Sequence, residues 1–191
     1  EQAKPFLNDA VDAFTYVESL IADNNIECGW HKRGYFLGAW CQSHFDAMAK
    51  KVEALNAEAQ SGAAMVSRDE QRGDIGSDYY HGGMVVERAA HLHPALYYKG
   101  LLALVQKAGV SIASRTPVMG LVQNADNSWA VKTPRGTVRA GQVLIATNGY
   151  TGDVTPQLKR RVVPVGSYII ATEELAPEIV ASISPKNRSF A

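Results

Sequence analysis

The sequence predicts an α/β fold that includes the later half of a nucleotide-binding domain. Three features predict it: a helix that begins at Pro94, short alternating strands over residues 117–140, and a continuous apolar strand over residues 143–146. A strand that is apolar throughout is typical of a parallel sheet that is buried on both faces. In such sheets ligands bind beyond the carboxyl ends of the strands, so the residues after position 146 are the first candidates for a ligand site.

The first half of the chain is expected to alternate helices with short strands. An apolar stripe at spacings of three and four predicts an amphipathic helix near the N-terminus. Aromatic segments on either side of a polar turn predict a hairpin over residues 27–40. A second helix is expected from its cap at Ser43 to its end at Gly62. Residues 65–90 indicate a short strand, a turn of helix and strands around a Gly-Gly bend.

The second half is expected to hold more strand than helix. Proline is tolerated at the first position of a helix, and Gly109 is expected to end the helix that Pro94 begins. The strands that follow are expected at residues 111–116, 117–123, 128–133, 137–140 and 142–147. After them we expect a long strand over residues 165–175, a short helix over 177–182, and the start of one more strand at the end of the sequence.

Composition argues against several classes of function. With 46% hydrophobic and 20% charged residues, the chain resembles an ordinary globular protein that buries a sizeable core. Its 19 basic and 19 acidic side chains cancel, so no global field attracts nucleic acid or an anionic membrane. No apolar run approaches the roughly 18 residues of a membrane span, and the N-terminus has no leader pattern. We therefore expect a cytoplasmic protein with no nucleic-acid partner and no membrane span.

The histidines and cysteines do not predict a metal site. His91 and His93 alternate as two ligands on one strand would, but His93 precedes a helix, and no cysteine or carboxylate lies at ligand spacing nearby. Cys28 and Cys41 are expected to be buried free thiols. No serine lies in a nucleophile elbow, so the catalytic residues stay unknown.

An aromatic group in the first half has two possible roles. Its members could line an apolar pocket for an amine, although packing in the core is the favoured role for most of them. They are Trp30, Tyr35, Phe36, Trp40, Tyr79 and Tyr80.

The end of the apolar strand is the main candidate site. Small residues after a buried strand let backbone N–H groups approach a bound anion or sugar. Thr147 and Asn148 can donate hydrogen bonds, and Gly149 can adopt a positive φ. A plain turn with no ligand is the alternative. The glycine-rich dinucleotide fingerprint GxGxxG is absent from the sequence.

Several segments in order resemble one known family. They are LHPALYYKGLLALVQKAGV, the T-x-V at residues 116–118, GTVRAGQVLIATNGYTGDVTPQL and VVPVGSYIIATEEL. Together they resemble the FAD-dependent amine oxidases of the D-amino-acid oxidase-like superfamily, and most of all its γ-glutamylputrescine oxidase-like members. The match is good over residues 92–175 and looser before them.

The resemblance implies a role for each part of the chain. Residues 1–91 would belong to the substrate domain, residues 92–150 would be the second part of the FAD-binding domain, and residues 151–191 would begin a second substrate-domain segment. Val118 would meet the adenine end of FAD through its backbone. The remaining predicted FAD contacts are Ala146, Thr147, Asn148 and Gly149.

The resemblance also implies an activity, which is the oxidation of a C–N bond in a small-molecule amine by hydride transfer to FAD. Tyr168 and Arg33 are the candidates for substrate contact. The family's fingerprint and its C-terminal segment are missing, so the chain is expected to be an internal fragment that binds FAD weakly or not at all and has no turnover alone. Two alternatives stay open: a non-enzymatic binding module on a cofactor-less scaffold, and, less favoured, an NAD(P)-linked reductase.

Overall fold

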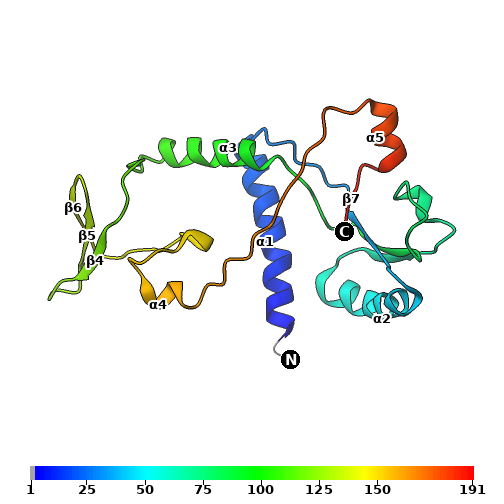
Figure 1. The fold of residues 1–191 in the computed structure, drawn as a ribbon, viewed down its shortest axis with the longest axis horizontal. Coiled ribbons are helices and arrows are strands. Elements are labelled where there is room, and N and C mark those ends of the chain that lie inside the picture. The colour runs from blue at the N-terminus through cyan, green and yellow to red at the C-terminus, as the bar shows by residue number, and fades with distance from the viewer. Residues whose placement is uncertain (1–2) are drawn as a thin grey trace. The chain divides into compact units, whose positions relative to one another are not determined.

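The computed structural model describes residues 3–191 and divides the chain into two compact units. Residues 1–110 and 172–191 form the first, which we call the N-terminal unit. Residues 111–171 form the second, which we call the meander unit. Both combine helices with strands, which confirms the predicted α/β class (Figure 1). These two units are defined by contacts within the chain and not by ligand binding. The predicted division into FAD-binding and substrate domains therefore stays a prediction.

The N-terminal unit is built on a four-stranded sheet in the order β2-β3-β1-β7. The strands are β1 (Tyr35–Gly38), β2 (Ala63–Val66), β3 (Gly83–Val86) and β7 (Ser189–Phe190). β3 is antiparallel to both β1 and β2, whereas β7 runs parallel to β1. β3 is central, and all of its residues are buried. The predicted hairpin over residues 27–40 is therefore wrong, because Tyr35–Gly38 pairs with β3 and not with the residues before the turn.

Helix α2 (Gln42–Ala59) packs on one face of this sheet. Its buried residue Met48 meets Met84 and Val86 of β3. The opposite face buries Phe36 and Val85, because neighbouring residues of a strand point to opposite faces. Side chains that alternate between the two faces of β1 and β3 therefore contribute to the apolar clusters on both sides of the sheet.

The ends of α2 differ from the prediction. Cys41, and not Ser43, is the cap residue, and the Ser43 hydroxyl lies 3.1 Å from the Cys41 sulfur. This hydrogen bond lowers the pKa of the Cys41 thiol. Cys28 is buried as expected, but Cys41 is exposed, so the expectation for Cys41 was wrong. Gln60 ends the helix in the left-handed conformation, two residues before Gly62.

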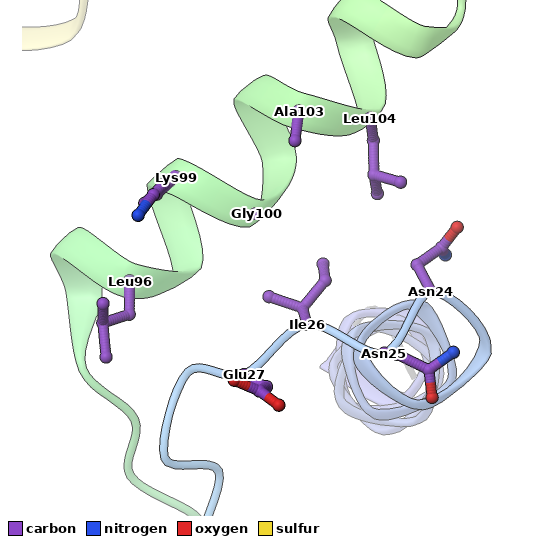
Figure 2. A pocket seen from close by; sticks show the side chains of 9 residues that line it. All are labelled: Asn24, Asn25, Ile26, Glu27, Leu96, Lys99, Gly100, Ala103 and Leu104. Atoms are coloured by element: carbon purple, nitrogen blue, oxygen red, sulfur yellow. The ribbon is translucent and has the colours of Figure 1, made fainter.

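Helices α1 (Ala3–Asp23) and α3 (Pro94–Lys107) form a second core region. Both were predicted, and His93 caps α3 by accepting a 3.4 Å hydrogen bond at Nδ1 from the Leu96 N–H. Ile26 lies so close to α3 that a Cβ at Gly100 would be 2.3 Å from its side chain. An open cavity of ≈ 390 Å³ lies beside this contact, between α3 and the turn after α1 (Figure 2).

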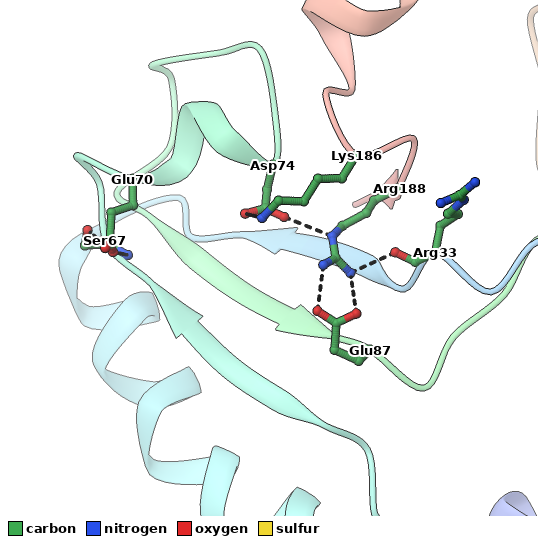
Figure 3. Close-up of polar contacts among 7 residues, drawn as sticks. All are labelled: Arg33, Ser67, Glu70, Asp74, Glu87, Lys186 and Arg188. Carbon is green, nitrogen blue, oxygen red and sulfur yellow. Dashed lines mark hydrogen bonds and ion pairs between the residues drawn. The ribbon is translucent and has the colours of Figure 1, made fainter.

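The C-terminal segment returns to the N-terminal unit through a buried guanidinium. After the predicted short helix α5 (Pro177–Ile183), Arg188 places its side chain, 8% exposed, between two carboxylates (Figure 3). It donates to both oxygens of Glu87, at 2.6 and 2.9 Å, and its Nε lies 2.9 Å from Asp74. These hydrogen bonds hold the pKa of Glu87 below its usual range. Lys186 adds a 3.0 Å ion pair to Asp74 beside the 3₁₀ helix η1 (Gln71–Gly73).

The meander unit contains a three-stranded antiparallel sheet in the order β4-β5-β6. The strands are β4 (Gly120–Gln123), β5 (Trp129–Thr133) and β6 (Gly136–Ala140), all within predicted strands or one residue beyond them. A 3₁₀ helix, η2 (Asn148–Tyr150), and a short helix, α4 (Pro156–Lys159), follow.

Three of the strands predicted after residue 110 are not formed. Residues 111–116, 142–147 and 165–175 contain no strand. A strand that is apolar on both faces is stabilised by neighbours on both sides, and among the described residues none pairs with these segments. Leu144 and Ile169 are consequently 90% and 92% exposed.

No helix among residues 3–191 is long and apolar enough to cross a bilayer.

We expect Arg188→Gln to lower the free energy of unfolding by about 3 kcal/mol, because it leaves the Asp74 carboxylate, 4% exposed, with only Lys186 as its partner. Arg72→Gln is the matched control, since it breaks the Arg72–Asp78 pair, in which both side chains are 64% exposed. The control should cost far less, because an ion pair between exposed side chains contributes little to stability. Urea unfolding of the two variants measures the difference, and equal losses would contradict the prediction.

Candidate functional site

The meander unit contains a cavity of ≈ 420 Å³ at the place where the sequence predicts a nucleotide site. Its walls come from the start of the meander and from the segment after β6. Most of the lining side chains are aliphatic. The full lining consists of Pro117, Val118, Leu121, Val131, Val143, Leu144, Ile145, Ala146, Thr147, Tyr150, Gly152, Val154 and Thr155. Three of the five predicted FAD contacts, namely Val118, Ala146 and Thr147, therefore line one cavity.

Val118 lines this cavity, and its backbone is unpaired among the described residues. The ladder between β4 and β5 is extended by a 2.7 Å hydrogen bond from the Met119 N–H to the Lys132 carbonyl. One residue earlier, neither the N–H nor the C=O of Val118 is hydrogen-bonded within the described part of the chain. The N–H donor and the C=O acceptor of this one residue are thus available to a ligand. The planar edge of an aromatic base needs both kinds of group.

Asn148 and Gly149 do not line the cavity. Both lie in η2, where the Tyr150 N–H donates to the Thr147 carbonyl at 2.9 Å. The left-handed residue is Asn148, with a φ of 48°, and Gly149 does not use its freedom to adopt a positive φ. Asparagine tolerates this conformation better than most residues, which is why the turn does not need its glycine there. A Cβ added at Gly149 would meet nothing within 4 Å.

The segment before η2 keeps its backbone free. Residues 143–146 make no backbone hydrogen bond to any other described residue. The side chains of this segment nevertheless line the cavity from one side. The turn is held by threonine: the hydroxyls of Thr147 and Thr151 lie 2.8 Å apart, and Thr151 donates to the Asn148 carbonyl at 2.7 Å.

The meander supplies cavity residues that sequence reasoning did not single out. Leu121 and Val131 lie directly opposite each other on β4 and β5, and both line the cavity. The sequence signal for these residues was the alternation of apolar and polar side chains along β4 and β5. It identifies a shared face only when it is known which residues of the two strands are paired.

The predicted substrate contacts lie elsewhere. Tyr168 belongs to the meander unit, is 95% exposed and does not line the cavity. Arg33 is an exposed residue of the N-terminal unit, and its carbonyl accepts a 2.8 Å hydrogen bond from Arg188.

The aromatic group divides into a buried and an exposed part. Phe36 is fully buried, whereas Trp40 and Tyr79 are 61% and 67% exposed. Trp40, Tyr79 and Tyr80 pack edge to face with ring centroids 5.4–5.7 Å apart. Rings at this separation contact one another and leave no room for an amine between them.

Formal charge is divided unevenly between the units. The meander unit has 7 basic and 2 acidic side chains, a net charge of +5, while the rest of the chain has 12 basic and 17 acidic side chains, a net charge of −5. Both acids of the meander unit are paired, Asp126 with Arg139 and Asp153 with Lys159. Hydrogen bonds from Ser128, followed by Arg139, lower the pKa of Asp126, and the hydrogen bond from Lys159 lowers that of Asp153. An anionic ligand is therefore favoured at this unit.

Comparison with known proteins gives the family. Residues 3–190 match the family described as FAD dependent oxidoreductase. The chain belongs to that family. A probable oxidoreductase, OrdL, of Haemophilus influenzae is 29% identical over 189 residues, which are 96% of this chain and 43% of the relative. The gamma-glutamylputrescine oxidoreductase of Escherichia coli is 26% identical over 172 residues, 90% of this chain and 40% of the relative.

Solved structures of the same kind share the fold. The glycine oxidase of Geobacillus kaustophilus superposes with a TM-score of 0.66 at 15% identity, over 80% of this chain and 42% of that one. The L-proline dehydrogenase of P. horikoshii gives a TM-score of 0.63 at 14% identity, over 75% and 38%. The chain thus spans less than half the length of the relatives it matches. Membership in the family confirms the predicted resemblance and FAD as the family's cofactor.

We expect Asn148→Ala to destabilise the η2 turn by roughly 1 kcal/mol, because alanine tolerates a left-handed φ poorly. Gly149→Ala is the matched control, since that position has neither a positive φ nor a neighbour within 4 Å. Hydrogen exchange of the Tyr150 amide should accelerate about fivefold in the first variant only. Equal exchange in both variants would contradict the assigned turn.

Proposed function

We propose that this chain contributes part of the FAD site of an enzyme that oxidises the C–N bond of an amine, an amino acid or a glutamylated polyamine. The observation that carries the proposal is the cavity of the meander unit, where Val118, Ala146 and Thr147 line one space. Membership in a family of FAD-dependent oxidoreductases, and a relative named for γ-glutamylputrescine, support the class of reaction and substrate.

The chemistry of the cavity fits the nucleotide end of FAD. Aliphatic side chains such as Leu121 and Val131 suit the faces of a planar base, and the unpaired backbone of Val118 suits its polar edge. The Thr147 hydroxyl can hydrogen-bond to a sugar or phosphate oxygen. The net charge of +5 on the meander unit favours the negative charge of a dinucleotide.

In this proposal the residues of the chain hold and orient, while the flavin supplies the redox chemistry. A bound FAD would supply the hydride acceptor for oxidation of the C–N bond to an imine. Apolar walls exclude water from the bound dinucleotide, and Val118 and Ala146–Gly149 fix its position. Arg33 and Tyr168 remain the proposed substrate contacts.

The proposed site is one wall only. The sequence has no GxGxxG, the element that binds a dinucleotide pyrophosphate in the usual way. We therefore propose that residues 1–191 alone bind FAD weakly and do not turn over substrate.

Site-specific FAD binding can be measured on the 191-residue chain by backbone NMR. We expect FAD to shift the amides of Val118 and Ala146–Gly149 with weak affinity. Thr147→Ala should weaken binding about tenfold, since it removes the hydroxyl proposed to hydrogen-bond to a sugar or phosphate oxygen. Thr151→Ala is the control, because it removes the other hydroxyl of the same pair but Thr151 does not line the cavity. Shifts confined to other residues would contradict the site, and a flavin spectrum that survives desalting would contradict the weak binding.

The reaction itself is tested on the complete open reading frame that encodes residues 1–191. We expect the product to carry a flavin spectrum that bleaches with one member of a panel of amines, amino acids and glutamylated polyamines. A purified, folded product that binds no flavin would instead favour the non-enzymatic binding module.

A further inference from the structure

Two histidines meet in the N-terminal unit, where the chain before β1 runs beside the chain before α3, and Arg33 lies close enough for its charge to act on His91. His31 and His91 lie opposite each other in an isolated antiparallel bridge. Their ring centroids are 5.4 Å apart and the rings are tilted by 50°, so the imidazoles lie side by side. Arg33 follows two residues after His31, and its positive charge acts on His91. We call these residues the His-Arg cluster.

The backbone under the His-Arg cluster is fixed. The His31 N–H donates to the His91 carbonyl at 2.9 Å, and the His91 N–H donates to the His31 carbonyl at 3.0 Å. The Arg33 carbonyl accepts from Arg188, which is itself held by two carboxylates. A ligand would therefore meet a prearranged backbone, and only side-chain rotamers would be ordered on binding.

Among the described residues, no carboxylate neutralises the His-Arg cluster. Among residues 3–191, neither the Arg33 guanidinium nor either imidazole forms an ion pair. The nearby Glu87 is engaged by Arg188, and Figure 3 shows the Arg33 side chain turned away from both of them. Burial lowers the pKa of His91, and the positive charges of His31 and Arg33 lower it further. Concentrated positive charge without a counter-ion stabilises an anion.

We propose that His31, Arg33 and His91 bind a small oxyanion, either a carboxylate or a phosphate. The guanidinium provides a planar fork of donors for two oxygens, and each imidazole provides an N–H for another contact. The site lies in the N-terminal unit and shares Arg33 with the proposed substrate contacts, but anion binding requires no flavin and can be measured whether or not the proposed oxidation occurs.

A metal ion is the alternative ligand for a pair of histidines. Two features oppose it. The Arg33 charge beside the rings repels a cation, and no group of three or more His, Cys, Asp or Glu side chains that could hold a metal occurs in the described residues. The observations therefore favour the anion.

The test is an NMR titration of the imidazole C2–H resonances of the 191-residue chain with inorganic phosphate, with acetate, and with Ni²⁺. We expect phosphate or acetate to shift both His31 and His91 and to raise the pKa of His91. Binding should strengthen as the pH falls through the range where the His91 imidazole protonates, because its charge then adds to that of Arg33. The difference between the phosphate and acetate arms identifies the preferred oxyanion.

Variants assign the binding to the cluster. Arg33→Gln should weaken oxyanion binding about tenfold, the effect of losing one charged pair of hydrogen bonds. Lys32→Gln is the matched control: it removes the same charge from the adjacent residue, whose partner is Glu18, and should leave affinity within about twofold. Circular dichroism checks that both variants are folded. The proposal is overturned if neither anion shifts the two histidines, if Lys32→Gln and Arg33→Gln weaken binding equally, or if Ni²⁺ alone binds.

Discussion

The buried guanidinium of Arg188 is the interaction on which the N-terminal unit depends. It ties the chain beside the last strand to two distant positions. Glu87 lies 101 positions earlier in the sequence, and Arg33, whose carbonyl accepts the hydrogen bond, lies 155 positions earlier. β7 has only two residues, so its ladder alone could not order the return of the chain. Gly34 is part of the same arrangement, since a Cβ there would lie 2.3 Å from the Arg188 Nη1 atom. A desolvated cation is tolerated because carboxylates on two sides offset its lost hydration.

Local sequence signals predicted the helices and missed the partners of the strands. α1, α2, α3 and α5 were all expected, because apolar spacing, caps and prolines act within a few residues. The meander was expected for the same reason, as its turns are short. Tyr35–Gly38 was predicted as a strand but given the wrong partner, because its neighbour β3 lies almost fifty residues further along the chain. Arg188 carried no sequence signal, since its two acids are close only in the folded unit.

The candidate site was predicted in part. Val118, Ala146 and Thr147 line one cavity, and their contact with a bound nucleotide stays a prediction. Asn148, and not Gly149, has the left-handed conformation, because the φ angles of a tight turn depend on hydrogen bonds that the sequence does not display. The apolar run at residues 143–146 was expected to be a buried strand, which is a property of a sheet and not of one segment. The His-Arg cluster could not be predicted for a similar reason. His91 was considered together with His93, which is near it in sequence, whereas the histidine near it in space is His31.

The open backbone of residues 143–146 has a consequence for the chain in solution. Leu144 is 90% exposed, and Ile169 and Ile170, in another unpaired apolar stretch, are 92% and 95% exposed. Extended apolar segments with free N–H and C=O groups are templates for pairing between molecules. Self-association at high protein concentration would therefore begin at these two stretches, whereas β1 and β3, each flanked by strands on both sides, would take no part in it.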